Sequence, residues 1–345
     1  MSRAAGGNEA SARVRSPLPV ELKESHARDL RVIGNPQGGV LFLALIAALI
    51  AFPYLSPGWL TFLASLVAVY SVAAIGLNLL VGFTGQISLG HAAFLGLGAY
   101  ATALLARAGA PFPVALAASG LAAALAGVLI GLPTLRLTGP YLAIATLGFG
   151  IAVQQVLLNW EEVSGGHMGL VVPRPQLADW VIRGDVMTFH LVAAVALLMG
   201  LVAVNLVRSN VGRAWAAIRD SDLAAEVVGV DLRKYRTMAF AVSAAFTGIA
   251  GGLFAYVVRF INPEAFSFFE SVYLLAMVVV GGLASVPGSI LGAAVITLLP
   301  HFLAGLRDTP QILFGTIIIA IMLFEPRGLF GRWLKVKRYW KTWPF

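Results

Sequence analysis

Polar side chains interrupt one apolar stretch of this 345-residue chain, and their types suit binding of a polar solute. The interruption spans 76–90, reads GLNLLVGFTGQISLG and contains four glycines, and His91 follows it directly. Irregular backbone at membrane depth is tolerated only where it is buried in protein or lines a cavity, and broken helices often line a translocation path. The candidate path residues are Asn78, Thr84, Gln86, Ser88, His91, Tyr100 and Thr146.

Each of these features also has a simpler interpretation. The segment 76–90 could be an ordinary loop between two helices. A lone histidine in a helix of small residues, such as His91 or the more distant His301, is more often a hydrogen-bonded packing residue than a proton carrier. A second interruption, 281–292, reads GGLASVPGSILG, and it is either the counterpart of 76–90 in an internal repeat or an unrelated break.

A second group of residues lies in the polar loop 208–236. Asp220 or Ser221 is a suitable N-cap for a short helix over 222–228, and Gly229 is placed to end that helix in a left-handed conformation. A short, capped helix that projects from a membrane domain suits docking into a cleft on a cytosolic partner. The alternative is a surface helix that only connects two spans.

The composition argues against an enzyme, a metalloprotein and a nucleic-acid-binding protein. The chain has no cysteine, five scattered histidines, no HExxH and no GxxxxGK[ST] phosphate loop. We therefore expect no catalytic residue, no metal site and no cofactor bound by this chain. Acidic residues are nearly absent from the apolar stretches, with Glu270 at the start of one and Glu325 at the end of another, so an ion-coupled mechanism lacks its usual carboxylate.

The elements that must position these residues are transmembrane helices. Hydrophobic residues make up 59% of the chain and charged residues only 12%, against roughly 25% in soluble domains. Apolar blocks of the length that a spanning helix needs recur along the sequence. The predicted spans are 38–55, 59–81, 88–106, 112–132, 141–159, 187–207, 237–258, 269–283, 288–303 and 311–324. Closely spaced glycines (127 and 131, 248 and 252, 288 and 292) indicate close helix packing within the chain or a face for a second subunit.

The distribution of basic residues predicts the topology. With ten spans, 19 Lys and Arg residues fall on the side of both termini and 5 on the other, so both termini are expected in the cytoplasm. This distribution accounts for the net charge of +8 without nucleic acid. The predicted fold is all-α, a polytopic membrane protein of about ten helices with broken helices near the midplane. Its parts are a cytoplasmic tail (1–37), a transmembrane domain (38–325) with an extracytoplasmic loop (160–186) and a cytoplasmic loop (208–236), and a basic cytoplasmic tail (326–345).

Four stretches resemble the LivM-type permease subunits of branched-chain amino-acid ABC importers. They are GLNLLVGFTGQISLGHAAFLGLGAY (76–100), LRLTGPYLAIATLGF (135–149), GRAWAAIRDSDLAAEVVGV (212–230) and EPRGLFG (325–331). Ala224, Ala225 and Gly229 also resemble part of the general coupling motif of importer permeases. In that motif a glutamate precedes the alanines, whereas here Leu223 takes its place. The outer loop departs from relatives at His167 and Met168, where they often have a polar or acidic residue.

The resemblance implies a multi-pass subunit of the bacterial cytoplasmic (inner) membrane, surrounded by membrane lipid. Its implied partners are a LivH-like permease, two LivG- and LivF-like ATPases that use ATP, and an extracytoplasmic binding protein that delivers leucine, isoleucine or valine. The residues expected to couple to the ATPases are Arg219, Asp220, Asp222, Ala224, Ala225, Glu226 and Gly229. The alternatives are a related permease for urea, short amides or another small solute, and, less favoured, a stand-alone ion-coupled carrier.

Overall fold

The computed structural model describes residues 36–303, apart from 136, 138, 178 and 179, together with 315, 316, 319, 323 and 328–333. The chain divides into two compact units, 1–42 and 43–345. In the first unit the described residues, 36–42, are helical. The account below concerns the second unit.

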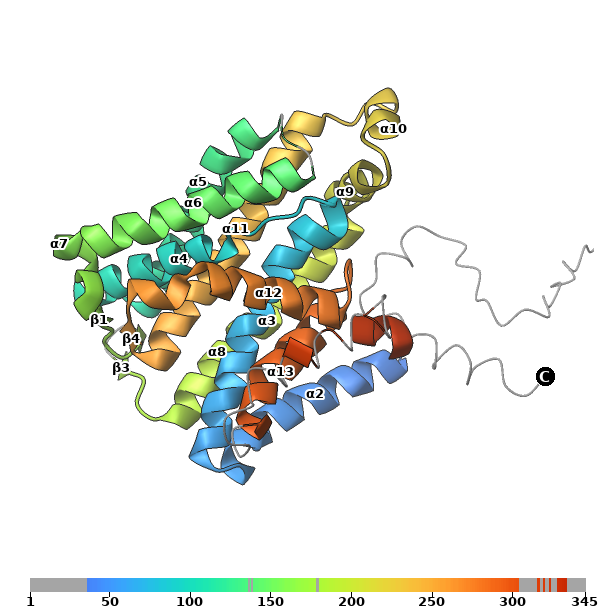
Figure 1. Cartoon of the computed structure of the whole chain (residues 1–345). Helices are drawn as coiled ribbons and strands as arrows, with labels where there is room; N and C mark the ends of the chain where they lie inside the picture. Colours follow the sequence, from blue (N-terminus) through green and yellow to red (C-terminus); the bar gives the residue numbers. More distant parts are fainter. Residues whose placement is uncertain are drawn as a thin grey trace, which may run out of the picture. The chain divides into compact units, whose positions relative to one another are not determined.

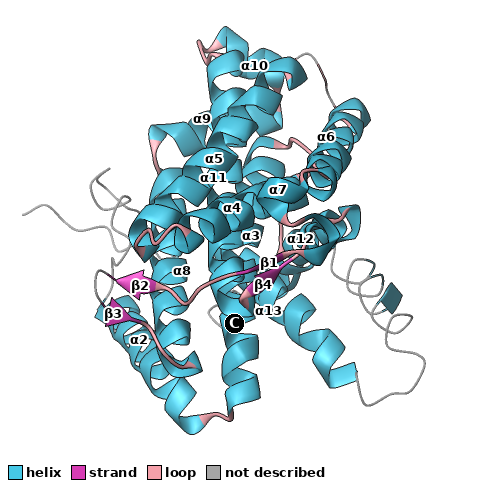
Figure 2. Cartoon of the chain, turned by 90° about the vertical axis from the view of Figure 1, so that its left-hand side faces the viewer, coloured by secondary structure: helices cyan, strands magenta, loops and turns pink. Residues whose placement is uncertain are grey.

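Helices form nearly all of the described chain (Figures 1 and 2). The long and apolar helices are α2 (Pro36–Leu55), α3 (Gly58–Thr84), α4 (His91–Arg107), α5 (Phe112–Thr134), α6 (Pro140–Asn159), α8 (Asp185–Arg208), α11 (Leu232–Val258), α12 (Phe268–Gly281) and α13 (Val286–Leu303). The shorter helical segments are α7 (Glu161–Ser164), η1 (Gly166–Met168), α9 (Asn210–Asp220), α10 (Asp222–Val227) and η2 (Pro263–Phe266).

These helices match nine of the ten predicted spans in position. Among the described residues, five helices are long and apolar enough to cross a membrane, and three shorter apolar helices accompany them. The tenth predicted span, 311–324, lies mostly outside the described residues, as do the tail 1–35 and most of the tail 326–345. The chain is therefore a multi-pass membrane protein, and the number ten stays a prediction.

The core is built around α11, which packs most extensively against α5, α3 and α4. Small residues allow these helices to approach closely. A Cβ atom on Gly251 would overlap the main-chain carbonyl oxygen of Leu95 in α4, and one on Gly98 would overlap that of Gly248. The glycine pairs singled out in the sequence likewise face other helices of this chain, since Gly127 meets Ala244. Packing within the chain thus explains their spacing.

Two short β-ribbons are the structure's departure from a purely helical prediction. β1 (Leu170–Val171) pairs antiparallel with β4 (Phe260–Ile261), and β2 (Gln176–Leu177) with β3 (Trp180–Val181). β1, β2 and β3 belong to the predicted outer loop 160–186, and β4 follows the end of α11. Because α10 precedes the start of α11, β4 and α10 lie at opposite ends of a helix about 40 Å long (Figure 1).

Candidate functional site

The predicted break 76–90 is confined to 85–90, because residues 76–84 continue helix α3, and the polar side chains at the break are hydrogen-bonded within the chain. α3 ends at Thr84, and Gly85 takes the left-handed conformation (φ 72°) that closes the helix. The Thr84 hydroxyl donates to the Leu80 carbonyl (2.6 Å), and the Gln86 amide donates to the Thr84 Oγ1 (2.9 Å). Helix α4 then begins at His91. The six residues 85–90 thus connect the two helices, and the buried side chains of Thr84 and Gln86 beside this connection have hydrogen-bond partners in the protein.

His91 joins three helices at this break. Its side chain is fully buried, its Nδ1 lies 2.9 Å from the Ser88 hydroxyl, and its Nε2 lies 2.7 Å from the Ser243 hydroxyl in α11. The Ser243 hydroxyl also donates to the Gly76 carbonyl of α3 (2.6 Å). With both ring nitrogens hydrogen-bonded to protein groups, His91 has the environment of a packing histidine, the simpler of the two interpretations of the sequence.

Asn78, which lies within helix α3 before the break, connects this helix to the second interruption. Its amide Nδ2 lies 3.3 Å from the Gly282 carbonyl, 3.0 Å from the Ser285 carbonyl and 2.7 Å from the Ser289 Oγ, and its Oδ1 accepts from the Ala284 N–H (3.0 Å). Asn78 is 1% exposed. One buried amide of helix α3 therefore holds the turn between α12 and the start of α13, which is the irregular part of the predicted interruption 281–292.

The remaining candidate path residues divide into two locations. Thr146 of α6 adjoins the break, because its hydroxyl accepts from the Leu89 N–H (3.0 Å) and donates to the Ala143 carbonyl (3.0 Å). Tyr100 lies nine residues beyond His91 on α4, about 14 Å along the axis. Its ring packs against Phe266 (centroids 6.1 Å apart), and its buried hydroxyl has no hydrogen-bond partner.

The polar loop 208–236 folds as the sequence predicts. The Ser221 hydroxyl caps α10 by accepting from the Ala224 N–H (3.3 Å), so Ser221 rather than Asp220 is the N-cap. Gly229 has φ 87°, and the Gly229 and Val230 N–H groups donate to the Glu226 and Ala225 carbonyls (both 3.0 Å). This pair of bonds is a Schellman motif, which satisfies the last carbonyls of the helix. The helix spans 222–227, one residue shorter than predicted.

Two buried contacts fix this loop to the spans. The Trp215 indole of α9 is fully buried, and its Nε1–H donates to the Tyr235 carbonyl of α11 (3.0 Å). Arg236 Nη2 pairs with Asp222 Oδ2 (2.5 Å), which ties α10 to the first turns of α11. Arg219, at the end of α9, lies beside Gly85 in the α3–α4 break. The loop is therefore in direct contact with the segment that holds the candidate path residues.

The exposed side of α10 and its C-cap carries three aliphatic residues. Leu223, Val227 and Val228 are 76%, 87% and 75% exposed, whereas Ala225 is buried against the chain itself. Asp222, one of the predicted coupling residues, is engaged by Arg236 of the same chain, while Arg219, Asp220, Ala224, Glu226 and Gly229 are exposed. The surface that α10 offers to another protein thus includes three aliphatic residues that the sequence motif did not single out.

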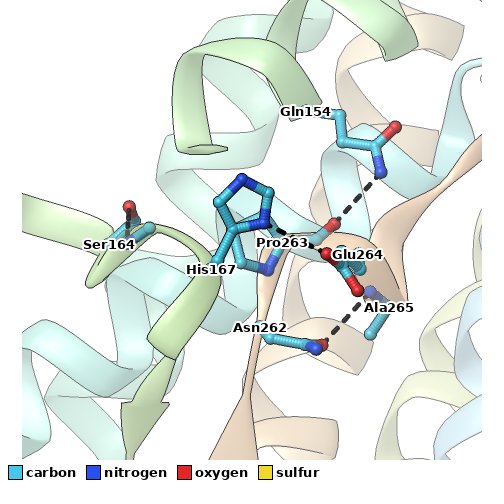
Figure 3. A network of polar contacts seen from close by, with 8 residues as sticks. Gln154, Ser164, His167, Asn262, Pro263, Glu264 and Ala265 are labelled. Carbon is cyan, nitrogen blue, oxygen red and sulfur yellow. Dashed lines mark hydrogen bonds and ion pairs between the residues drawn. The ribbon is translucent and has the colours of Figure 1, made fainter. Parts of the chain in front are cut away.

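A polar network at the opposite end joins two loops (Figure 3). His167 Nδ1 lies 3.1 Å from Glu264 Oε1, and the Gln154 amide donates to the Pro263 carbonyl (3.4 Å). Asn262 caps η2 by accepting from the Ala265 N–H. Together with the β1–β4 ribbon, these contacts attach the loop 160–186 to the connection between α11 and α12.

One polar group in the interior was not among the predicted site residues. Glu270, at the first turn of α12, lies beside Tyr70 of α3, and its Oε1 is shielded from solvent without a hydrogen-bond partner. The sequence placed Glu270 at the start of a span, but Tyr70 is 200 residues away and no local pattern connects the two. Within the described residues, no group of three or more His, Asp or Glu side chains is placed to hold a metal ion.

Comparison with known proteins decides the family. Residues 59–324 match the family model described as the branched-chain amino acid transport system permease component. The chain belongs to this family. LivM of Escherichia coli K12, a high-affinity branched-chain amino acid transport permease, is 36% identical over 315 residues, which cover 84% of this chain and 74% of LivM. LivM of Salmonella typhimurium LT2 is 34% identical over the same shares.

More distant relatives include LivH of Methanocaldococcus jannaschii, named a probable branched-chain amino acid transport permease, which is 26% identical over 58% of this chain and 67% of LivH. No solved structure matches the chain significantly. The permease is therefore one subunit of a branched-chain amino-acid ABC importer, and ATP hydrolysis is the task of other subunits. The resemblance stated from the four sequence motifs is confirmed.

Proposed function

We propose that this permease forms half of the path by which leucine, isoleucine and valine enter a bacterial cell across its cytoplasmic membrane. In this proposal it has ten spans with both termini in the cytoplasm. It pairs with a LivH-like permease, two LivG- and LivF-like ATPases work below, and an extracytoplasmic binding protein delivers the amino acid. The identity to LivM over most of both chains supports the substrate class. The 19 basic residues on the side of α10 support the orientation.

The observation that carries the coupling role is the geometry of α10. The helix is capped at both ends, is fixed to α11 through Asp222 and Arg236, and exposes Leu223, Val227 and Val228. Exposed aliphatic side chains on a short rigid helix suit insertion into an apolar cleft of a partner. Because Arg219 adjoins the α3–α4 break, a displacement of α9 and α10 by an ATPase reaches the break directly.

The candidate path residues hold the break that borders the proposed path. Thr84, Gln86, Ser88, His91 and Thr146 hydrogen-bond to one another or to main-chain groups around it. In this proposal a change in the break, driven from the cytosolic side, opens or closes the route for the amino acid. The permease itself contributes neither a cofactor nor an ATP site.

The test uses charge placed on the exposed face of α10. The double variant Leu223→Asp/Val227→Asp is expected to lower both leucine uptake and the stimulation of ATPase activity by loaded binding protein at least tenfold, because two carboxylates cannot enter an apolar cleft without large desolvation cost. Ala216→Asp, on the exposed side of neighbouring α9, is the matched control and should keep both activities. Both variants must insert and assemble as the wild type does.

The orientation has a separate test, since the chain lacks cysteine. A cysteine introduced at Leu223 should react with an impermeant thiol reagent in inverted membrane vesicles and stay unlabelled in intact cells. Labelling in intact cells would place α10 outside and end the coupling proposal. Normal uptake and stimulation in the double aspartate variant would do the same.

A further inference from the structure

Among the acidic residues of the described apolar helices, Glu270 is the one that lies against another of these helices. Asp185, at the first turn of α8, is exposed, and α3, α4, α5, α6, α11 and α13 have no acid in their described segments. A carboxylate within transmembrane helices is costly, and such residues almost always face a bundle interior or a water-filled cavity. The position of the Glu270 carboxylate therefore requires an explanation.

The position of Glu270 is fixed from two sides. The neighbouring Ser271 is buried, and its hydroxyl accepts from the Ala92 N–H at the start of α4 (2.9 Å). This bond holds the first turn of α12 beside the α3–α4 break. On the other side, the Glu270 carboxyl lies beside the Tyr70 side chain. Tyr70 precedes the end of α3 by 14 residues, about 21 Å, so the pair lies well away from the cytosolic loop.

One oxygen of this carboxyl remains without a partner. Oε1 of Glu270 is shielded from solvent and accepts no hydrogen bond. Buried polar atoms are nearly always paired, and an exception calls for an explanation such as a ligand that is not present. Other buried polar groups near the break, including those of Asn78, Ser243 and His91, are all paired. The vacant acceptor is thus not general at the break, although the Tyr100 hydroxyl and the Thr297 Oγ1 in other spans also have no partner.

The surroundings suit a small organic cation that carries an aliphatic group. The Tyr70 ring lies against Phe254 (6.3 Å between centroids), and Phe254 lies against Phe266 (5.9 Å). Aromatic faces attract ammonium groups and also pack against aliphatic side chains. The neighbouring Phe269 is 77% exposed, so the start of α12 lies at an outer face of the subunit. A second permease or the path itself can therefore adjoin Glu270 there.

We propose that Glu270, oriented by Tyr70, binds the α-ammonium group of the amino acid as it crosses the permease. This inference rests on the proposed function, because it takes the transported solute to be an amino acid. The carboxylate supplies the negative charge and the free Oε1 acceptor, and the Tyr70 hydroxyl holds the other side of the group. A zwitterion in an apolar path requires such a counter-charge, since an unpaired ammonium group there is strongly disfavoured.

The experiment uses the complete transporter, with its partner permease, ATPases and binding protein, in proteoliposomes supplied with ATP and radioactive leucine. Glu270→Gln keeps the size and hydrogen-bonding capacity of the side chain and removes its charge. The initial rate of leucine uptake at saturating binding protein is expected to fall at least tenfold, while stimulated ATP hydrolysis stays within twofold of the wild type. The matched control is Glu264→Gln, an exposed acid of the outer network, which should change uptake less than twofold.

A loss of uptake smaller than fivefold in assembled Glu270→Gln overturns the inference. Should that variant fail to assemble, Tyr70→Phe decides, because it leaves the carboxylate in place and removes only the hydroxyl beside it. In the assembled complex, leucine uptake at least threefold below the wild type with stimulated ATP hydrolysis within twofold supports the inference, whereas uptake within threefold of the wild type overturns it. A failure of the proposed function itself looks different, since the wild-type complex would then take up no leucine.

Discussion

Replacement of Asn78 by leucine tests whether one amide of α3 holds the connection between α12 and α13 in place. Leucine is close to asparagine in size but cannot hydrogen-bond. The substitution removes every contact of the Asn78 amide with Gly282, Ala284, Ser285 and Ser289. Gly282, Ala284 and Ser285 belong to the turn between α12 and α13, and Ser289 belongs to the start of α13, so this connection should lose its attachment to α3.

The size of the effect follows from the number of bonds. Nδ2 carries two hydrogens and has three acceptors within 3.3 Å, so it makes two full bonds, and Oδ1 makes a third. Interhelical hydrogen bonds in membrane proteins contribute on average about 0.6 kcal/mol each, which gives about 2 kcal/mol for three. The buried Ala284 N–H left without an acceptor adds about 1–3 kcal/mol. We therefore expect Asn78→Leu to lower the free energy of unfolding by about 3–5 kcal/mol.

The measurement is unfolding of the purified permease in mixed micelles titrated with a denaturing detergent. Asn159→Leu is the matched control, because the Asn159 amide bonds only to Gln155 of its own helix at an exposed position. That variant should change the unfolding free energy by less than about 0.5 kcal/mol, as surface substitutions usually do. A decrease below 1 kcal/mol in Asn78→Leu would refute the claim that this amide holds the turn.

Two further predictions concern glycines. Gly251→Val should destabilise the permease by about 1–3 kcal/mol in the same titration, because a Cβ atom there overlaps a main-chain carbonyl of α4. Gly148→Val is the control, since a Cβ atom there meets nothing within 4 Å, and it should be much less destabilising. Equal effects of the two substitutions would contradict the packing argument. Gly229→Val forces a β-branched residue into a left-handed conformation at a cost of about 1–2 kcal/mol, so it should loosen α10 and lower stimulated ATPase activity severalfold in the reconstituted transporter without affecting membrane insertion.

Features set by local sequence were predictable. The spans follow from runs of apolar residues, which must exceed a fixed length to cross a bilayer, and the described helices agree with them. The cap at Ser221 and the left-handed Gly229 follow from side-chain and backbone preferences that act over a few residues. A break was expected over 76–90 because glycines and polar residues interrupt an otherwise apolar run, but the helix continues to Thr84 and the break is confined to 85–90.

Features set by long-range contact were not predictable. The partners of Asn78 lie more than 200 residues along the chain, and the Glu270 carboxyl meets Tyr70 at a similar separation. The β1–β4 ribbon joins residues 170–171 to 260–261, and two-residue strands leave no period in the sequence. The internal pairing of Asp222 with Arg236 also escaped the sequence, because the motif alone suggested that Asp222 faces a partner.

The polar residues of the break and the unpaired polar atoms of the interior have different physical reasons to exist. Backbone that leaves the helix at membrane depth exposes N–H and C=O groups that lipid cannot satisfy, so nearby side chains must bond them, as Thr84 and Thr146 do. A side chain whose hydrogen-bonding groups are all engaged in this way has no free donor or acceptor for a solute. A solute needs a group that the fold leaves vacant, and Oε1 of Glu270 and the hydroxyl of Tyr100 are vacant. Polarity in the sequence therefore locates the break, whereas a vacant acceptor in the structure is the ground for the proposal that Glu270 binds the amino acid.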